Sequence, residues 1–150
     1  ITKIGTAGLE LIKGFEGFYS KPYLCPAGVP TIGYGATYYE DGTRVRLSDQ
    51  PITQERALQL LKNVLVQYEA AVDSFTRDDI TQNQFDALVS FSYNVGTQAL
   101  KNSTLLKRVN SNPLDSDIRN QFMRWNKGGG VILKGLTRRR QAEADLYFKG

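Results

Sequence analysis

The feature that most constrains the fold is a long stretch of helical periodicity in the middle of the chain. Apolar residues recur at three- and four-residue spacing and form one stripe, made of Ala57, Leu60, Leu61, Val64, Leu65, Tyr68, Ala71, Val72 and Phe75. Thr53 precedes the stripe and is suited to cap a helix. The pattern predicts a helix over residues 53–75, about 22 residues and about 33 Å long. We interpret it as a connector between two lobes.

The segments before this helix predict a small β-lobe over about residues 17–50. A first helix is expected over residues 6–16, with Thr6 as its N-cap. Residues 22–47 read as short strands and turns. The sequence Cys25-Pro26-Ala27-Gly28 is typical of a type I turn that folds Tyr23-Leu24 back against Val29-Pro30-Thr31. Residues 40–43 predict a second turn. The arginines of Arg44-Val45-Arg46 could then face substrate or solvent, and we favour solvent.

The strand after the first turn carries an unusual pattern of glycines. Because side chains alternate across a strand, Thr31, Gly33 and Gly35 should share one face. Ile32, Tyr34 and Ala36 should share the other and pack on the body of the protein. Glycine within a strand often marks close approach by a ligand. We read the glycine face as the floor of a cleft, with a glycine-rich hairpin of no chemical role as an equal alternative.

The C-terminal half predicts an all-helical lobe over about residues 76–150. Helices are expected over residues 81–95, from residue 103 or 104 to about 109, over 115–126 and over 136–148. Trp125 reads as a core anchor, and Gly128-Gly129-Gly130 needs unusual backbone angles. Arg138-Arg139-Arg140 falls in the first turn of the last helix, where positive charge is unfavourable with the helix dipole. The fold class is therefore α+β, in a single domain with a cleft between the lobes.

Composition narrows the class of partner. The net charge of +4 favours an anionic partner such as nucleic acid, anionic lipid or a bacterial wall polymer, although a mixed solvated surface explains it as well. Scattered basic residues and the lack of a reader motif argue against nucleic acid. We expect no metal site, because histidine is absent, and no membrane-spanning segment or signal peptide. The chain opens with Ile rather than Met, so the full protein could have a further segment before residue 1.

Two side chains in the β-lobe suit catalysis. Glu16 ends the first helix beside Phe15, Phe18 and Tyr19, and apolar neighbours disfavour an ionised carboxylate, which suits a general acid. Cys25, the one cysteine, lies in a turn and is a candidate reactive thiol, though a lone cysteine is more often inert.

The order and spacing of several motifs resemble those of the phage-type lysozymes, the endolysin muramidases. The pattern is Glu16, Cys25 nine positions later and Thr31 six beyond it in TIGYG. It continues in SFSYNVG at 90–96, STLL at 103–106, Trp125 before the three glycines, and Gly135-Leu136 before the arginines. Cys25 stands where the family usually has Asp, and Ala36 where many members have His.

The resemblance implies a lysozyme-like fold and cleavage of the β-1,4 bond between N-acetylmuramic acid and N-acetylglucosamine. It implies Glu16 as proton donor, Cys25 in the role of the Asp and Thr31 as the holder of the attacking water. Substrate contacts are implied for Tyr34, Tyr93, Asn94, Thr104 and Arg138. The resemblance also implies that an arginine near the start of the last helix pairs with Glu16, with Arg138 as the first candidate and Arg139 as the second. Alternatively, the three arginines form a basic surface patch. Tyr93 could equally be core packing.

The resemblance also sets the partners. It implies a monomer that needs no cofactor, acts on peptidoglycan, and neither binds nucleic acid nor inserts stably into membranes. Such a phage product would be made in the host cytoplasm and act at the cell wall. Inversion with water attack is favoured over retention with Cys25 as nucleophile. The rivals are a lytic transglycosylase and a non-catalytic cationic wall or membrane binder.

Overall fold

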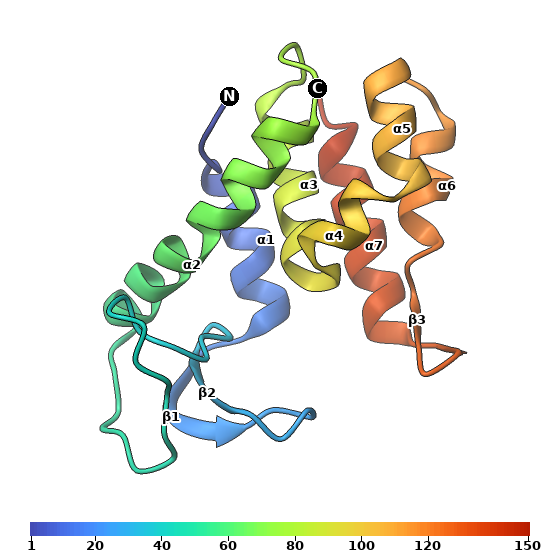
Figure 1. Ribbon diagram of the computed structural model, residues 1–150. Coiled ribbons are helices and arrows are strands. Elements are labelled where there is room, and N and C mark those ends of the chain that lie inside the picture. The colour runs from blue at the N-terminus through green and yellow to red at the C-terminus, as the bar shows by residue number, and fades with distance from the viewer. The chain divides into compact units, whose positions relative to one another are not determined.

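The protein, described here by a computed structural model, has all of residues 1–150 described and contains seven helices and four short strands (Figure 1). The elements are α1 (Thr6–Glu16), β1 (Tyr19–Leu24), β2 (Pro30–Gly33), α2 (Gln54–Phe75), α3 (Gln82–Val95), α4 (Thr97–Lys101), α5 (Thr104–Ser111), α6 (Asp117–Met123), β3 (Lys127–Gly128), β4 (Val131–Ile132) and α7 (Lys134–Tyr147). They divide into two compact units. We call Ile12–Val66 the hairpin unit, and Ile1–Leu11 with Gln67–Gly150 the helical unit.

Helix α2 confirms the prediction made from the central apolar stripe. It runs over 22 residues, and the Thr53 hydroxyl oxygen accepts a hydrogen bond of 3.1 Å from the backbone N–H of Arg56. This is the expected cap, because it satisfies an N–H that has no partner within the helix. The residues of the stripe that are fully or almost fully buried are Ala57, Leu60, Leu61, Leu65 and Val72.

The first hairpin also forms as predicted. β1 and β2 pair antiparallel, with Tyr23 opposite Thr31 and Leu24 opposite Pro30. The turn between them closes through a 2.8 Å hydrogen bond from the Gly28 N–H to the Cys25 carbonyl, and Gly28 has a φ of 78°. A residue with a side chain rarely adopts that backbone angle, so glycine is favoured at this position.

The expected glycine face does not extend along a strand, and this prediction is wrong. Ile32 and Ala36 exchange two backbone hydrogen bonds of 2.9 Å, so the chain turns sharply between them. Gly33 and Gly35 lie in this turn with φ of 67° and 92°. A Cβ on Gly33 would lie 3.1 Å from the Cβ of Ala57. The glycine therefore allows the turn and the close packing of α2, rather than the approach of a ligand.

The opposite set of residues packs inward as expected. Ile32, Tyr34 and Ala36 are at most 6% exposed. Ile32 and Ala36 form the core of the hairpin unit with Val45 and Leu60, and Tyr39 and Ile52 pack against it. The long segment between β2 and α2 is thereby fixed to the sheet and to the helix by apolar burial, although it contains almost no regular structure.

Helix α3 is the central element of the helical unit. Thr81 and Gln84 form a capping box at its start, and Gly96 follows its end with a φ of 99°. The sequence predicted one inward face, but every residue from 84 to 92 is buried. A helix buried on all sides is packed by neighbours all round. Its main partner is α7, which in turn packs on α6.

The remaining boundaries differ slightly from the predictions. Ser103 caps α5, accepting a 3.0 Å hydrogen bond from the Leu106 N–H, and α5 runs to Ser111. Helix α6 is shorter than expected. Gly129 and Gly130 have the predicted unusual angles, with φ of 59° and 82°. They form the turn of the β3–β4 hairpin, which the sequence analysis missed although Gly-Gly is a hairpin signal.

The start of α1 is capped by a distant residue rather than by Thr6, which already lies within the helix. Asp86 of α3 is 1% exposed and accepts hydrogen bonds from the N–H groups of Gly5 (2.9 Å) and Gly8 (3.1 Å). A Cβ on Gly8 would lie 2.7 Å from the Cβ of Asp86, so only glycine permits this approach. The carboxylate supplies the acceptors that the helix N-terminus requires.

A buried charge cluster corrects two expectations about the arginines of the last helix. α7 begins at Lys134, so the arginines lie in its second turn. Arg139 and Arg140 are 4% and 0% exposed and pair with the fully buried Glu143, so neither contributes to a basic surface patch. The Ser90 hydroxyl donates a 2.6 Å hydrogen bond to Glu143, and Arg140 donates one of 2.7 Å to Asn94.

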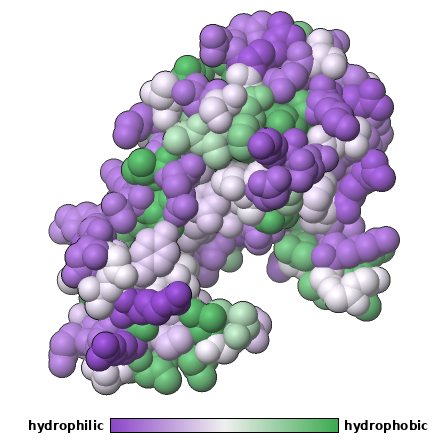
Figure 2. Space-filling view, in the orientation of Figure 1, coloured by the Kyte–Doolittle hydropathy of each residue, from purple (hydrophilic) through white to green (hydrophobic).

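The surface mixes polar and apolar residues. Figure 2 shows hydrophilic residues over much of the visible face, with hydrophobic residues scattered among them. None of the helices combines the length and the apolar character that crossing a membrane requires.

Candidate active site

Glu16 is the last residue of α1 and is partly exposed. The helix ends here because Gly17 takes a φ of 74°, while its N–H still donates a 2.9 Å hydrogen bond to the Lys13 carbonyl. Its neighbours in sequence enclose it less than expected. Phe15 and Tyr19 are 39% and 46% exposed, so much of their surface faces solvent. The carboxyl group therefore lies where the chain passes from α1 into β1.

Cys25 opens the turn between β1 and β2, and it is partly exposed. Backbone hydrogen bonds from Val29 and Ala27 lower the pKa of its thiol, and the side chain of Thr31 adds to the effect, while desolvation opposes it. Hydrogen-bond donors around sulfur favour the thiolate over the thiol. The turn geometry thus makes ionisation of this thiol easier than in an unstructured chain.

Thr31 lies on β2 and is 3% exposed. Its hydroxyl donates a 2.9 Å hydrogen bond to the Val29 carbonyl and is within hydrogen-bonding reach of the Cys25 side chain. Because Val29 also accepts from the Cys25 N–H at 3.1 Å, one carbonyl holds both residues. The structure therefore brings Cys25 and Thr31 together.

Tyr23 lies on β1, in the strand that runs from Tyr19 to the turn at Cys25, and it was not singled out from the sequence as a functional residue. It lies opposite Thr31 in the β1–β2 ladder. Burial raises the pKa of the Tyr23 hydroxyl, and the charges of Tyr19, Glu16 and Cys25 raise it further. Its hydroxyl is therefore within electrostatic range of both Glu16 and Cys25. The signal in the sequence was its place two residues before Cys25, near the end of the strand that leads into the turn.

Tyr34 occupies the turn between Gly33 and Gly35. Only 6% of it is exposed, its ring lies 5.7 Å from that of Phe18, and the Lys13 ammonium lies 5.7 Å from its centroid. Most of its surface is therefore used in packing within the hairpin unit.

In the helical unit, Tyr93 and Asn94 end α3. Tyr93 is partly exposed, and its ring packs edge-on against that of Tyr68 at 5.2 Å and 88°. Asn94 is exposed, and its side-chain oxygen accepts from Arg140. The buried charge cluster thus fixes the orientation of the Asn94 amide, which leaves its NH₂ group directed elsewhere.

Thr104 lines a cavity of about 320 Å³ at the start of α5. The other lining residues are Asn102, Ser103, Gln121, Arg124 and Trp125. Trp125 packs edge-on against the core residue Phe91 at 5.6 Å and 89°, so it anchors the core as predicted and also presents surface to the cavity. Gln121 and Arg124 were not singled out from the sequence, because isolated polar residues on a helix are ordinarily solvated.

Arg138 is exposed on α7, unlike the two arginines that follow it. No group of three or more His, Cys, Asp or Glu side chains is arranged to hold a metal ion.

A model of the phage lysozyme family matches residues 13–143. The endolysin of Bacillus phage B103 is 43% identical over 152 residues, covering 98% of this chain but 54% of that protein. The chain thus spans about half the length of that relative and of the Bacillus phage PZA endolysin, of which it covers 56%.

Solved structures resemble the chain over its whole length. The endolysin of Escherichia coli O157:H7 phage FAHEc1 superposes with a TM-score of 0.90 at 39% identity, covering 97% of this chain and 93% of its own. The muramidase domain of SpmX from Asticaccaulis excentricus superposes with a TM-score of 0.87 at 36% identity, covering 100% of both chains. The expected lysozyme-like α+β fold is thereby confirmed, and the chain belongs to the phage lysozyme family.

Proposed function

We propose that the chain is an endolysin-type muramidase that hydrolyses the β-1,4 bond between N-acetylmuramic acid and N-acetylglucosamine in peptidoglycan. Family membership supports this, as does the similarity to a domain described as a muramidase. The observation that supports the catalytic assignment most directly is the grouping around the first hairpin. Tyr23 is within electrostatic range of Glu16 and Cys25, and Thr31 reaches the side chain of Cys25.

The roles follow from what glycoside hydrolysis requires. Glu16 donates its proton to the glycosidic oxygen as the bond from that oxygen to the anomeric carbon breaks. A water molecule attacks the anomeric carbon from the opposite face, and the Cys25 thiolate accepts a proton from that water. The Thr31 hydroxyl orients the water. Atoms balance, because the proton that leaves Glu16 is matched by the proton gained at Cys25.

Inversion is the outcome of this route. The alternative route, direct attack of Cys25 on the anomeric carbon, would give retention through a covalent intermediate. We favour water attack because the spacing of Glu16, Cys25 and Thr31 resembles the pattern of inverting enzymes.

The cavity at the start of α5 supplies a candidate sugar contact in the helical unit. It combines the surface of Trp125 with the polar side chains of Thr104, Gln121 and Arg124. A carbohydrate is bound by such a mixture, since aromatic surface packs on the ring and polar groups bind hydroxyls. Tyr93, Asn94, Tyr34 and Arg138 complete the proposed substrate contacts.

The test of this function is the chemistry of the products. Purified peptidoglycan is digested with the protein, and the soluble fragments are analysed by mass spectrometry and by NMR of the first-formed anomer. A muramidase releases fragments with a reducing N-acetylmuramic acid, and the route through water gives the inverted anomer first. Anhydro-sugar ends would instead identify a lytic transglycosylase, and intact glycan after clearing would identify a non-catalytic binder.

The Cys25→Asp variant should move the acidic limb of the pH–rate profile. The Cys25 thiol has a pKa below its usual value but is ordinarily far less acidic than a carboxyl group. As pH falls through the thiol pKa, the thiolate takes up a proton and the wild-type rate falls. An Asp carboxylate remains ionised to about pH 4, so the variant should keep its activity to lower pH. Initial rates of wall clearing between neutral and acidic pH measure this.

Cys25→Ser is the matched control for that experiment. A serine hydroxyl has nearly the size of the thiol but does not ionise in this range, so activity should be low at every pH. Equal profiles for the cysteine and serine forms would exclude a role for the thiolate.

The proposed setting follows from the proposed reaction. The chain would be made in the host cytoplasm as a phage product and act as a monomer on the cell wall, with no cofactor.

A further inference from the structure

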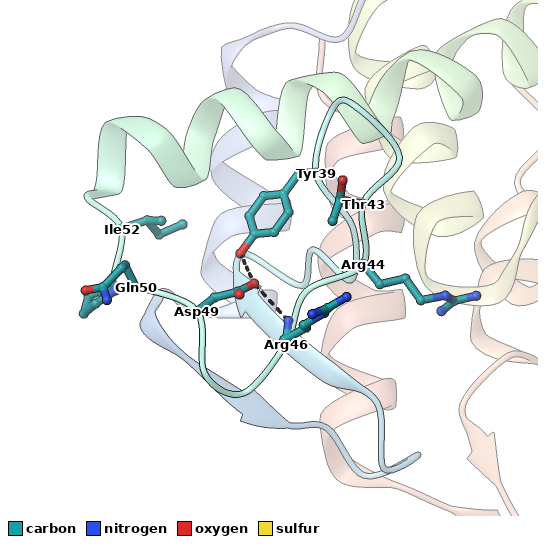
Figure 3. A pocket seen from close by; sticks show the side chains of 8 residues that line it. Tyr39, Thr43, Arg44, Arg46, Asp49, Gln50 and Ile52 are labelled. Carbon is teal, nitrogen blue, oxygen red and sulfur yellow. Dashed lines mark hydrogen bonds between the residues drawn. The ribbon is translucent and has the colours of Figure 1, made fainter.

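The segment between β2 and α2 builds a cavity that the proposed reaction does not use. It has a volume of about 510 Å³ and lies entirely within residues 39–52 of the hairpin unit. Its lining consists of Tyr39, Thr43, Arg44, Arg46, Asp49, Gln50, Pro51 and Ile52. Figure 3 shows these side chains around the hollow of the loop. The volume lies within the range of small-ligand sites.

The walls of this cavity are held in place by specific contacts. The Tyr39 hydroxyl donates a 2.6 Å hydrogen bond to Asp49, which also accepts a 2.9 Å bond from the Arg46 N–H (Figure 3). Burial and this hydrogen bond raise the pKa of Tyr39 to about 12, so the hydroxyl keeps its proton and remains a donor. Val45 is 3% exposed and packs in the core of the hairpin unit. Hydrogen bonds to Asp49 and the burial of Val45 therefore hold the loop in one conformation.

Two arginine side chains project from this fixed loop, and Arg46 is near enough to Asp49 to attract its carboxylate without forming an ion pair with it. Arg44 and Arg46 flank the buried Val45, so both point outward, and Figure 3 shows them extending to the same side of the loop. No ion pair or side-chain hydrogen bond engages either guanidinium group. A solvated arginine is common, but two arginines, two residues apart, both line this cavity, so it offers an anion the donors of two guanidinium groups.

The neighbouring carboxylates are already engaged. Glu40 forms a two-point ion pair with Arg56, with a distance of 2.7 Å between Nη2 and Oε1, and this pairing lowers the pKa of Glu40 to about 2. Asp41 accepts from the Thr43 N–H at 2.9 Å. Asp49 is the one carboxylate that lines the cavity, and one of its oxygens accepts both bonds described above. The cavity therefore keeps a net positive lining.

We propose that this cavity binds an oxyanion of the bacterial wall, through Arg44 and Arg46, at a site separate from the bond-cleaving residues. The ligand chemistry is a phosphodiester or a carboxylate, because a guanidinium group binds both through two parallel hydrogen bonds. The wall carries such groups either on anionic polymers or on its peptides. The inference rests on the proposed function in that the wall is the partner.

The contact would hold the protein on an insoluble polymer while the glycan chain is cut elsewhere on it. Two linked contacts act together, because the second forms at a high effective concentration once the first is made. The net charge of +4 supplies a long-range attraction, and the arginine pair supplies a local site.

Sedimentation of the protein with purified, insoluble wall tests the proposal. All proteins carry Glu16→Gln, so that binding is measured without cleavage. Adding Arg44→Ala and Arg46→Ala together should weaken binding about tenfold or more, since each loses charge-assisted hydrogen bonds. The matched control is Lys62→Ala with Lys107→Ala, two exposed lysines on α2 and α5 whose loss removes the same number of positive charges as the loss of the two arginines. The control should bind nearly as the parent does.

Treated walls separate the two sources of the anion. If hydrofluoric acid, which removes phosphodiester polymers, abolishes the difference between the arginine variant and its parent, the ligand is a phosphodiester. If amidation of wall carboxyl groups abolishes it, the ligand is a carboxylate. Either result supports the site.

Three results would overturn the proposal. They are equal binding by the arginine and lysine variants, a difference that survives both treatments, and a difference seen only with vesicles of anionic lipid. Failure of the proposed reaction is recognised separately, because wild-type protein would then release no reducing ends from peptidoglycan whatever the binding results.

Discussion

Glu16→Gln should lower the rate of wall clearing roughly a thousandfold, within the range that a general acid contributes. Glutamine keeps the size and polarity of the side chain but has no proton to give to the departing oxygen. Since Glu16 ends α1 and is partly exposed, the replacement fits without repacking a core. Turbidity of a purified peptidoglycan suspension, followed over several decades of protein concentration, measures the loss.

The control for this change is the same substitution on another exposed acid. Glu55 lies in the first turn of α2 and is exposed, so Glu55→Gln removes one negative charge without touching the hairpin. It should clear the wall as the wild type does, and both variants should unfold at the wild-type temperature. Unchanged lysis by Glu16→Gln would instead favour a cationic binder that disrupts the wall or membrane without catalysis.

The sequence predicted those parts of the fold that depend on local order. The stripe behind Thr53 predicted α2, Thr81 and Gly96 marked both ends of α3, and the turn at Cys25 formed as its residues require. Each of these depends on residues within one turn or one helix face, which is the range over which periodicity and capping act.

The parts that could not be predicted depend on distant residues. Thr6 had the right chemistry for a cap, but Asp86, far away in the sequence, supplies the acceptors to α1. Gly33 read as room for a ligand, whereas its space is taken by Ala57. Periodicity carries no information about such tertiary contacts.

The candidate site likewise has features that the sequence could predict and features that depend on tertiary contacts. Glu16 and Cys25 could be proposed from the sequence, because their spacing resembles the pattern of the phage-type lysozymes. The electrostatic role of Tyr23 and the hydrogen bonds that act on the Cys25 thiol appear only once β1 and β2 are paired. A surface patch was the alternative interpretation of the arginines of α7, because charged residues are rarely buried unless paired. Glu143, three and four residues further along the helix, is the partner that changes this reading.

Glu143→Gln should destabilise the helical unit by about 3–5 kcal/mol, the cost of breaking a buried ion pair by removing one partner. The carboxylate is fully buried and pairs with both Arg139 and Arg140, while Ser90 donates to it. Burial raises the pKa of Glu143 and the two guanidinium groups oppose that shift, so the carboxylate and the arginines depend on each other. A neutral amide leaves two buried cations without a counter-charge. Thermal and urea unfolding followed by circular dichroism measure the loss.

The matched control is Asp145→Asn on the same helix. Asp145 forms an ion pair of 2.7 Å with Arg119, but its side chain is 65% exposed. An exposed pair contributes about 0–1 kcal/mol, because solvent screens it and both side chains lose freedom to form it. The two substitutions therefore make the same chemical change in opposite surroundings. If both substitutions lower the free energy of unfolding equally little, contacts other than those of Glu143 stabilise the buried arginines. Asn94, which accepts a hydrogen bond from Arg140, would then be the first residue to replace.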